Sequence, residues 1–131
     1  MSEPLKDVAV GMSGREEVLI TSELTVGHFV QGMPLVYATP MMILAMEVAS
    51  GAAVASHLPP GWVTVGAEVN ISHLAPTPVG RTVVATARVI AVEGRVVTFA
   101  VEAYDGERKI GEGTHRRGAI HLDSLAKRLG G

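Results

Sequence analysis

The sequence lacks cysteine, has few aromatic residues and contains no long run of basic side chains. Without cysteine among its 131 residues, the chain has neither a disulfide framework nor a thiol nucleophile. Its net charge is -2 at pH 7, and no basic run is longer than the two residues of Arg116-Arg117. The charge pattern therefore does not favour binding to nucleic acid or to an acidic membrane surface.

Motifs that mark cofactor and metal sites are also missing. There is no glycine-rich phosphate loop, no dinucleotide-binding fingerprint and no Gly-x-Ser-x-Gly nucleophile elbow. The five histidines show no paired spacing of the kind that metal ligands have. The sequence therefore predicts a site that uses neither a cofactor nor a metal ion.

The composition is typical of one globular domain. Hydrophobic residues make up 47% of the chain and charged residues 18%, which suits a chain of this length with one core. We predict a single domain over residues 1–131, in which 1–14 form a poorly ordered lead-in. The N-terminus has no apolar segment like that of a signal peptide, so we expect a cytoplasmic protein.

One long helix is predicted over residues 39–58. Pro40 suits the first helical turn, Thr39 can serve as the N-cap, and the Pro-Pro-Gly at 59–61 ends the helix. The helix is near the shortest length that spans a membrane, but its central Glu47 and its many small residues favour burial under a sheet.

Glu47 is the residue of this helix that most needs an explanation. It is the only Asp, Glu, Lys or Arg between Thr25 and Ala67, and a helix that is apolar on nearly all sides is a buried helix. A carboxylate inside the core or at its lip is costly unless it is protonated, hydrogen-bonded or part of a functional site.

The remaining chain has the pattern of β-strands joined by turns. Residues 62–74 alternate, with the odd-numbered residues up to His73 on the apolar face and Thr64 and Gly66 on the other face. Further strands are predicted at 17–26, 81–92, 95–104 and 107–120, and a short helix at 124–129. This order indicates an α+β fold in which a curved antiparallel sheet wraps around the long helix.

These two periodicities predict a chemical site. Glu47 is the only charge on the helix, and His73 is the only ionisable group on the sheet face that should meet the helix. Thr39 lies about 12 Å from Glu47 along the helix, so a second copy of the chain is needed to bring them together. A carboxylate, an imidazole and a hydroxyl in an apolar pocket suit acyl-transfer hydrolysis. Gly66 could offer its N–H to a developing oxyanion.

Each of these residues also has a plain structural interpretation. Thr39 taken alone is an N-cap, His73 a core histidine bonded to a carbonyl, and Gly66 the residue of a bulge. His115 and His121, near the chain end, are interpreted as surface groups. Only the joint placement of the three candidate residues favours catalysis.

The sequence resembles the hotdog-fold thioesterases, and most of all their fluoroacetyl-CoA thioesterase branch. The resemblance rests on Tyr37-Ala38-Thr39-Pro40 leading to Glu47, on the stretch from Val65 to His73, on Thr77-Pro78-Val79-Gly80, and on Gly113-Thr114-His115-Arg116-Arg117. It implies that Thr39, Glu47 and His73 form a catalytic trio, that Gly66 contacts substrate and that Arg117 lies near coenzyme A. It also implies a homodimer whose sheets join edge to edge, with sites built from both chains.

The loop at 28–38 could gate such a site. The resemblance implies that enzymes specialised for fluoroacetyl-CoA have a loop rich in aromatic residues here. This chain instead has Val30 and Met33 beside Phe29. We therefore expect hydrolysis of a different short or medium acyl-CoA thioester.

Two other functions remain open at this point. A hydratase of the same fold would be expected to place Asp and His in one short motif, but no Asp occurs between Asp7 and Asp105. A binding module without catalysis could use the same apolar cleft for an acyl chain or a small regulator. Release of free thiol separates the enzyme from the binding module.

Overall fold

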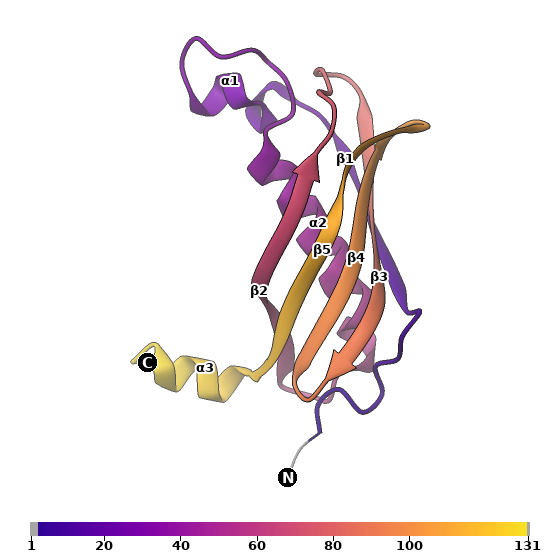
Figure 1. The fold of residues 1–131 in the computed structure, drawn as a ribbon. Helices are drawn as coiled ribbons and strands as arrows, with labels where there is room; N and C mark the ends of the chain where they lie inside the picture. Colours follow the sequence, from indigo (N-terminus) through magenta and orange to yellow (C-terminus); the bar gives the residue numbers. More distant parts are fainter. Residues whose placement is uncertain (1–2, 131) are drawn as a thin grey trace.

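The computed structural model describes residues 3–130 and contains one antiparallel sheet of five strands wrapped around a central helix (Figure 1). The order of the strands in the sheet is β1-β3-β4-β5-β2, so β1 and β2 are its two edges. The strands are β1 (Ser13–Leu19), β2 (Trp62–His73), β3 (Thr82–Glu93), β4 (Val96–Asp105) and β5 (Arg108–His121). The predicted curved sheet around one long helix is confirmed.

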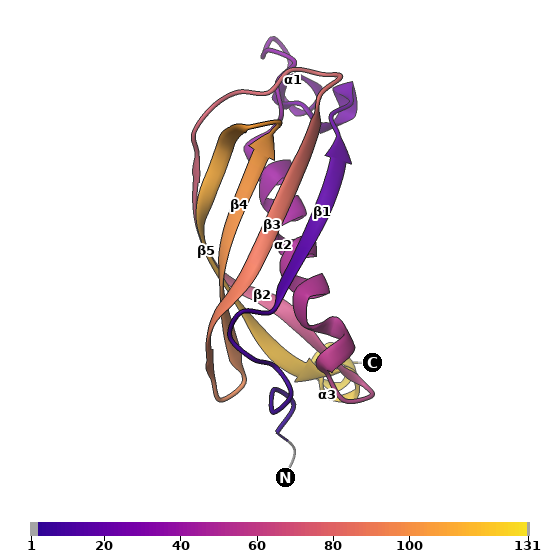
Figure 2. The same ribbon diagram turned by 90° about the vertical axis from the view of Figure 1, so that its right-hand side faces the viewer.

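The central helix α2 (Thr39–Val54) crosses the concave face of the sheet (Figure 2). It continues as a short 3-10 turn, η2 (Ala55–His57), before the Pro-Pro-Gly stop. Together these segments are long and apolar enough, by length and composition alone, to cross a membrane. Here the helix packs on the sheet through a stripe with helical periodicity. The residues of that stripe are Met42, Ala45, Met46, Ala49, Ser50, Ala53 and Val54.

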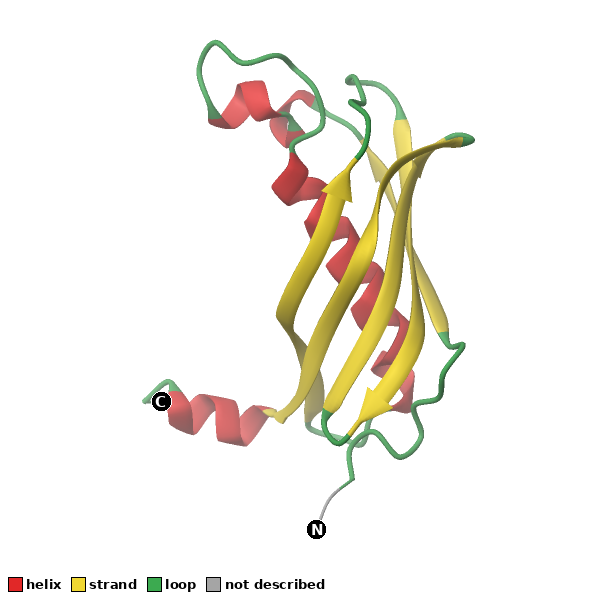
Figure 3. Ribbon diagram, viewed as in Figure 1, coloured by secondary structure: helices red, strands yellow, loops and turns green. Residues whose placement is uncertain are grey.

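The opposite face of α2 is not covered. Leu44 is 50% exposed and Val48 43% exposed, so this helix is not buried on all sides as its composition predicted. Three short helical segments complete the chain, and Figure 3 shows them at the two ends of the sheet. They are η1 (Ser22–Leu24), α1 (Val26–Phe29) and α3 (Leu122–Arg128).

The first strand lies earlier in the chain than predicted. Its prediction at 17–26 is wrong after Leu19, because the next residues fold into η1 and α1. Thr25 is fully buried, and its hydroxyl donates a hydrogen bond to the carbonyl of Ser22. A side chain that bonds to its own backbone in this way favours a turn over a strand.

The N-terminal lead-in also differs from the expectation. Within the described residues it forms turns, and Leu5 and Val8 are buried in the core cluster. Gly11 donates a backbone hydrogen bond to Val89, which anchors this segment to β3. Two apolar side chains can join a core without belonging to a helix or strand, so their segment shows no periodic pattern in the sequence.

A β-bulge in β2 changes which residues face the helix. The pairing of β2 with β5 shifts register between Gly66 and Glu68, so Ala67 is an extra residue. One extra residue reverses the alternation of a strand. Gly66 consequently faces α2, although simple alternation predicted it on the face away from His73.

Gly14 allows β1 to approach α2 closely. A Cβ at this position would lie 2.3 Å from the carbonyl oxygen of Ala49 and 2.7 Å from the amide nitrogen of Ala53. Neither backbone atom can rotate away, so even one methyl group needs a shift of the helix.

We expect Gly14→Ala to lower the free energy of unfolding by about 1–3 kcal/mol, the usual cost of overpacking. Urea unfolding measures the change. Gly118→Ala is the matched control in β5, because a Cβ there meets no heavy atom within 4 Å. Equal stabilities of the two variants would contradict the proposed tight contact.

Candidate active site

Thr39 and His73 meet where α2 begins and β2 ends. The Oγ1 of Thr39 lies 2.8 Å from the Nδ1 of His73, within hydrogen-bonding distance. The N-cap of α2 is Ala38, so the predicted capping role of Thr39 is wrong. Because the backbone N–H groups of Met41 and Met42 donate to the carbonyl of Ala38, the hydroxyl of Thr39 is available to the histidine.

The imidazole of His73 is held in its neutral form. Burial lowers the pKa of His73, and the backbone of Ala75 acts more weakly in the opposite direction. Its Nε2 is buried and has no hydrogen-bond partner among residues 3–130. A buried nitrogen without a partner is uncommon in folded proteins, and a catalytic role is one explanation for it.

A cleft of about 430 Å³ surrounds this pair. It is bordered by the Pro-rich segment after β2 and by Tyr37, whose hydroxyl donates a hydrogen bond to the carbonyl of Met41. Burial raises the pKa of Tyr37 to about 12, with a smaller contribution from Glu16, so this hydroxyl remains a donor at neutral pH.

Glu47 lies in a second cleft farther along α2. This cleft has a volume of about 540 Å³, runs between α2 and the first half of β2, and also contains Arg117 and Thr64. The side chain of Glu47 is 33% exposed, which places it at the lip of the core. A Cβ on Gly66 would lie 2.5 Å from the Oε1 of Glu47, so a larger residue here would displace the carboxylate.

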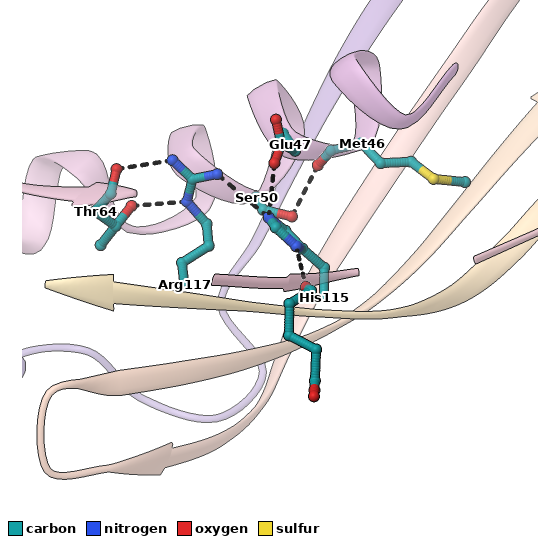
Figure 4. Close-up of polar contacts among 7 residues, drawn as sticks. Met46, Glu47, Ser50, Thr64, His115 and Arg117 are labelled. Atoms are coloured by element: carbon teal, nitrogen blue, oxygen red, sulfur yellow. Dashed lines mark hydrogen bonds and ion pairs between the residues drawn. The ribbon is translucent and has the colours of Figure 1, made fainter. Parts of the chain in front are cut away.

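Arg117 reaches into the second cleft from β5 (Figure 4). Its Nε donates to the Oγ1 of Thr64 at 2.9 Å, and its Nη2 donates to the carbonyl of Thr64 at 2.8 Å. Burial lowers the pKa of Arg117, and the negative charge of Glu47 partly opposes this change. Among the described residues that line this cleft, Arg117 is the only one with a cationic side chain.

His115 is not the surface group that the sequence predicted. It is 2% exposed and stacks against the ring of Phe99, with the ring centres 6.3 Å apart. Its Nε2 lies 3.8 Å from the Oε1 of Glu47 (Figure 4). The prediction failed because neighbouring arginines suggested an exposed strand, whereas alternation along β5 turns His115 inward.

One chain therefore contains two half-sites. The first consists of Thr39 and His73, and the second of Glu47, Gly66 and Arg117. They are separated by about 12 Å along α2, at 1.5 Å per residue. The expected meeting of Glu47 with His73 does not occur within one chain, where the histidine nearest to Glu47 is His115.

Val30 and Met33 lie apart from both clefts. They are 52% and 48% exposed, in the loop between α1 and α2, and they line neither cleft. A larger hollow of about 640 Å³ lies on the outer face of the sheet, and none of the predicted site residues lines it. The two clefts beside α2 are therefore the places that bring candidate residues together.

Comparison with known proteins places the chain in a family. A family model described as fluoroacetyl-CoA-specific thioesterase matches residues 20–123. The chain belongs to this family. The resemblance expected from the sequence is thereby confirmed.

One curated relative is the fluoroacetyl-CoA thioesterase of Streptantibioticus cattleyicolor. It is 44% identical over 92 residues, which is 70% of this chain and 66% of that protein. The match therefore spans slightly less than two thirds of the relative.

Solved structures share the fold over almost the whole chain. A structure of the fluoroacetyl-CoA thioesterase has a TM-score of 0.87 and 35% identity, covering 93% of this chain and 95% of that one. A thioesterase superfamily member from Thermus thermophilus has a TM-score of 0.85 and 30% identity, covering 95% and 94%. A hot-dog-like protein from Thermanaerovibrio acidaminovorans has a TM-score of 0.86 and 25% identity, covering 95% and 93%. The predicted hotdog fold is thereby confirmed.

The lowered pKa of His73 predicts how its ring titrates. An NMR titration of the ring protons should give a midpoint below the ordinary range of histidine. As the pH falls, the unfolded chain binds a proton at His73 at a higher pH than the folded chain does. The free energy of unfolding should therefore fall as the pH drops through the ordinary titration range of histidine. His73→Asn should reduce this slope. A midpoint at or above the ordinary range would contradict the assignment.

Proposed function

We propose that this protein hydrolyses a short or medium acyl-CoA thioester to a carboxylic acid and free coenzyme A. Membership of the fluoroacetyl-CoA-specific thioesterase family supports the reaction class. The observation that carries the proposal is the hydrogen bond between Thr39 and His73, which pairs a hydroxyl with a neutral imidazole beside a cleft. Such pairs serve nucleophilic and acid–base catalysis.

The proposed reaction breaks the bond between the acyl carbon and sulfur and adds the elements of water. Glu47 either attacks the thioester carbonyl or removes a proton from the attacking water. If Glu47 attacks, water then cleaves the acyl–Glu47 anhydride. In either route His73 passes a proton that originates from water to the departing thiolate, and Thr39 orients the nucleophile or takes its place. Gly66 offers its N–H to the oxyanion, and Arg117 contacts the coenzyme A part of the substrate.

This mechanism needs a homodimer, because the two half-sites lie apart in one chain. Strand β2 is an edge of the sheet, and its middle residues, including Val65 and Val69, are exposed. In the register we propose, two β2 edges pair antiparallel about a two-fold axis between Val69 and Asn70, so that Gly66 of one copy lies opposite His73 of the other. Each site would then combine Glu47 from one chain with Thr39 and His73 from its partner.

The residues of the loop between α1 and α2 support the proposal that the substrate carries an acyl group other than fluoroacetyl. The relative from Streptantibioticus cattleyicolor is named for fluoroacetyl-CoA. In this chain Phe29, Val30 and Met33 are all exposed, and only Phe29 is aromatic. We propose that this loop of one chain covers the cleft of its partner and that Val30 and Met33 contact the acyl group. A cytoplasmic location fits the coenzyme A substrate.

Glu47→Gln and His73→Ala should each lower turnover about 10²–10⁴-fold, since each removes a proposed acid–base group. Release of free thiol from a panel of acyl-CoA thioesters measures turnover. Glu107→Gln is the control, because Glu107 is exposed in a turn outside both clefts. Hydrolysis at the wild-type rate by Glu47→Gln would refute the mechanism. Tight acyl-CoA binding by the wild type without thiol release would favour a binding module.

Paired variants test whether the site is shared between chains. A purified heterodimer of a Glu47→Gln chain and a His73→Ala chain should have one intact site, and so about half of the wild-type turnover. A heterodimer of Thr39→Ala and His73→Ala chains is the matched control. Both of its changes fall in the same half-site, so neither of its sites is intact. Equal inactivity of the two heterodimers would contradict a site built from both chains.

A further inference from the structure

His115 is a buried polar residue for which the proposed reaction gives no role. Its ring is 2% exposed, lies between the sheet and α2, and stacks on Phe99. An imidazole in such a place is costly unless its nitrogens are bonded. Packing alone would be served by a phenylalanine, so the two ring nitrogens are the feature to explain.

The contacts of His115 determine which of its nitrogens carries the proton. Its Nδ1 lies 2.8 Å from the carbonyl oxygen of Glu68, which can only accept a hydrogen bond. Its Nε2 lies 3.3 Å from the Nη1 of Arg117, which can only donate. The ring is therefore neutral, with the hydrogen on Nδ1 and a lone pair on Nε2.

This lone pair completes a set of neutral acceptors around Arg117. The guanidinium donates to the hydroxyl and the carbonyl of Thr64 on one side and to His115 on the other (Figure 4). Glu47 lies close enough for its charge to raise the pKa of Arg117. Among residues 3–130, however, no nitrogen of Arg117 lies within 4.0 Å of the carboxylate.

That separation matters because arginine and carboxylate side chains readily form bidentate ion pairs. Such a pair would occupy the oxygen atoms of Glu47 and hold its negative charge, so Glu47 would become a weaker nucleophile and a weaker base. Thr64 and His115 together turn the guanidinium toward β2 and leave the carboxylate available.

We propose that His115 is a positioning residue that holds Arg117 away from Glu47. It acts through Arg117, since its own Nε2 lies 3.8 Å from the Oε1 of Glu47, beyond hydrogen-bonding distance. The effect on turnover rests on the function proposed above, whereas the position of Arg117 does not. The Nδ1 of His115 also donates a hydrogen bond to the carbonyl of Glu68 at the bulge. A test must therefore separate this bond of His115 from its bond with Arg117.

Substitution of His115 by asparagine separates them. The amide of the new side chain can still donate to Glu68, but it has no acceptor where Nε2 lies. We expect Arg117 to swing toward Glu47 in His115→Asn, which a crystal structure would show as a nitrogen–oxygen distance within hydrogen-bonding range. We also expect kcat to fall on the order of 10-fold, as when other orienting partners are lost, with KM little changed.

A double variant distinguishes positioning from a structural role. Adding Arg117→Met to His115→Asn removes the competing cation, so kcat should recover toward that of Arg117→Met alone, while KM rises as it does in that single variant. If the kcat of the double variant is no higher than that of His115→Asn, the proposal is overturned. Unchanged contacts of Arg117 in the crystal structure of His115→Asn would also overturn it. Wild-type turnover by Glu47→Gln would refute the proposed function, and the crystal structure would still decide the position of Arg117.

Discussion

The fit of α2 into the concave face of the sheet is the contact on which the rest of this protein depends. The buried stripe of the helix consists mainly of alanine and methionine, and Gly14 lets β1 lie directly on the helix backbone. Because protein interiors pack densely, this close fit allows α2 only one placement on the sheet. That position sets both half-sites, since it brings the first residue of α2 to the end of β2 and its middle to Gly66.

Much of this arrangement could be predicted from local sequence signals. The Pro-Pro-Gly stop, the hairpin turns and the alternation of the strands each depend on a few adjacent residues. These signals gave the element order and the curved sheet around the helix. They also drew attention to Glu47, because a single charge in a long apolar stretch stands out without any knowledge of its neighbours.

The parts that could not be predicted depend on contacts between distant residues. The bulge at Ala67 arises from the pairing of β2 with β5, and it reverses the face of Gly66. Thr39 has the residue type of an N-cap, but its hydroxyl is taken by a histidine 34 residues away. His115 is followed directly by two arginines in the sequence, and only the ring of Phe99 on β4 and the carbonyl of Glu68 on β2 explain its burial.

The N-terminal segment has a consequence of a different kind. The match to the family model begins at residue 20, yet the sheet begins at Ser13, and Leu5 and Val8 belong to the core. The folded unit is therefore longer than the range that the family model matches. The candidate site residues, from Thr39 to Arg117, all lie inside that range, whereas Leu5 and Val8 contribute buried apolar surface from a stretch that carries no catalytic candidate.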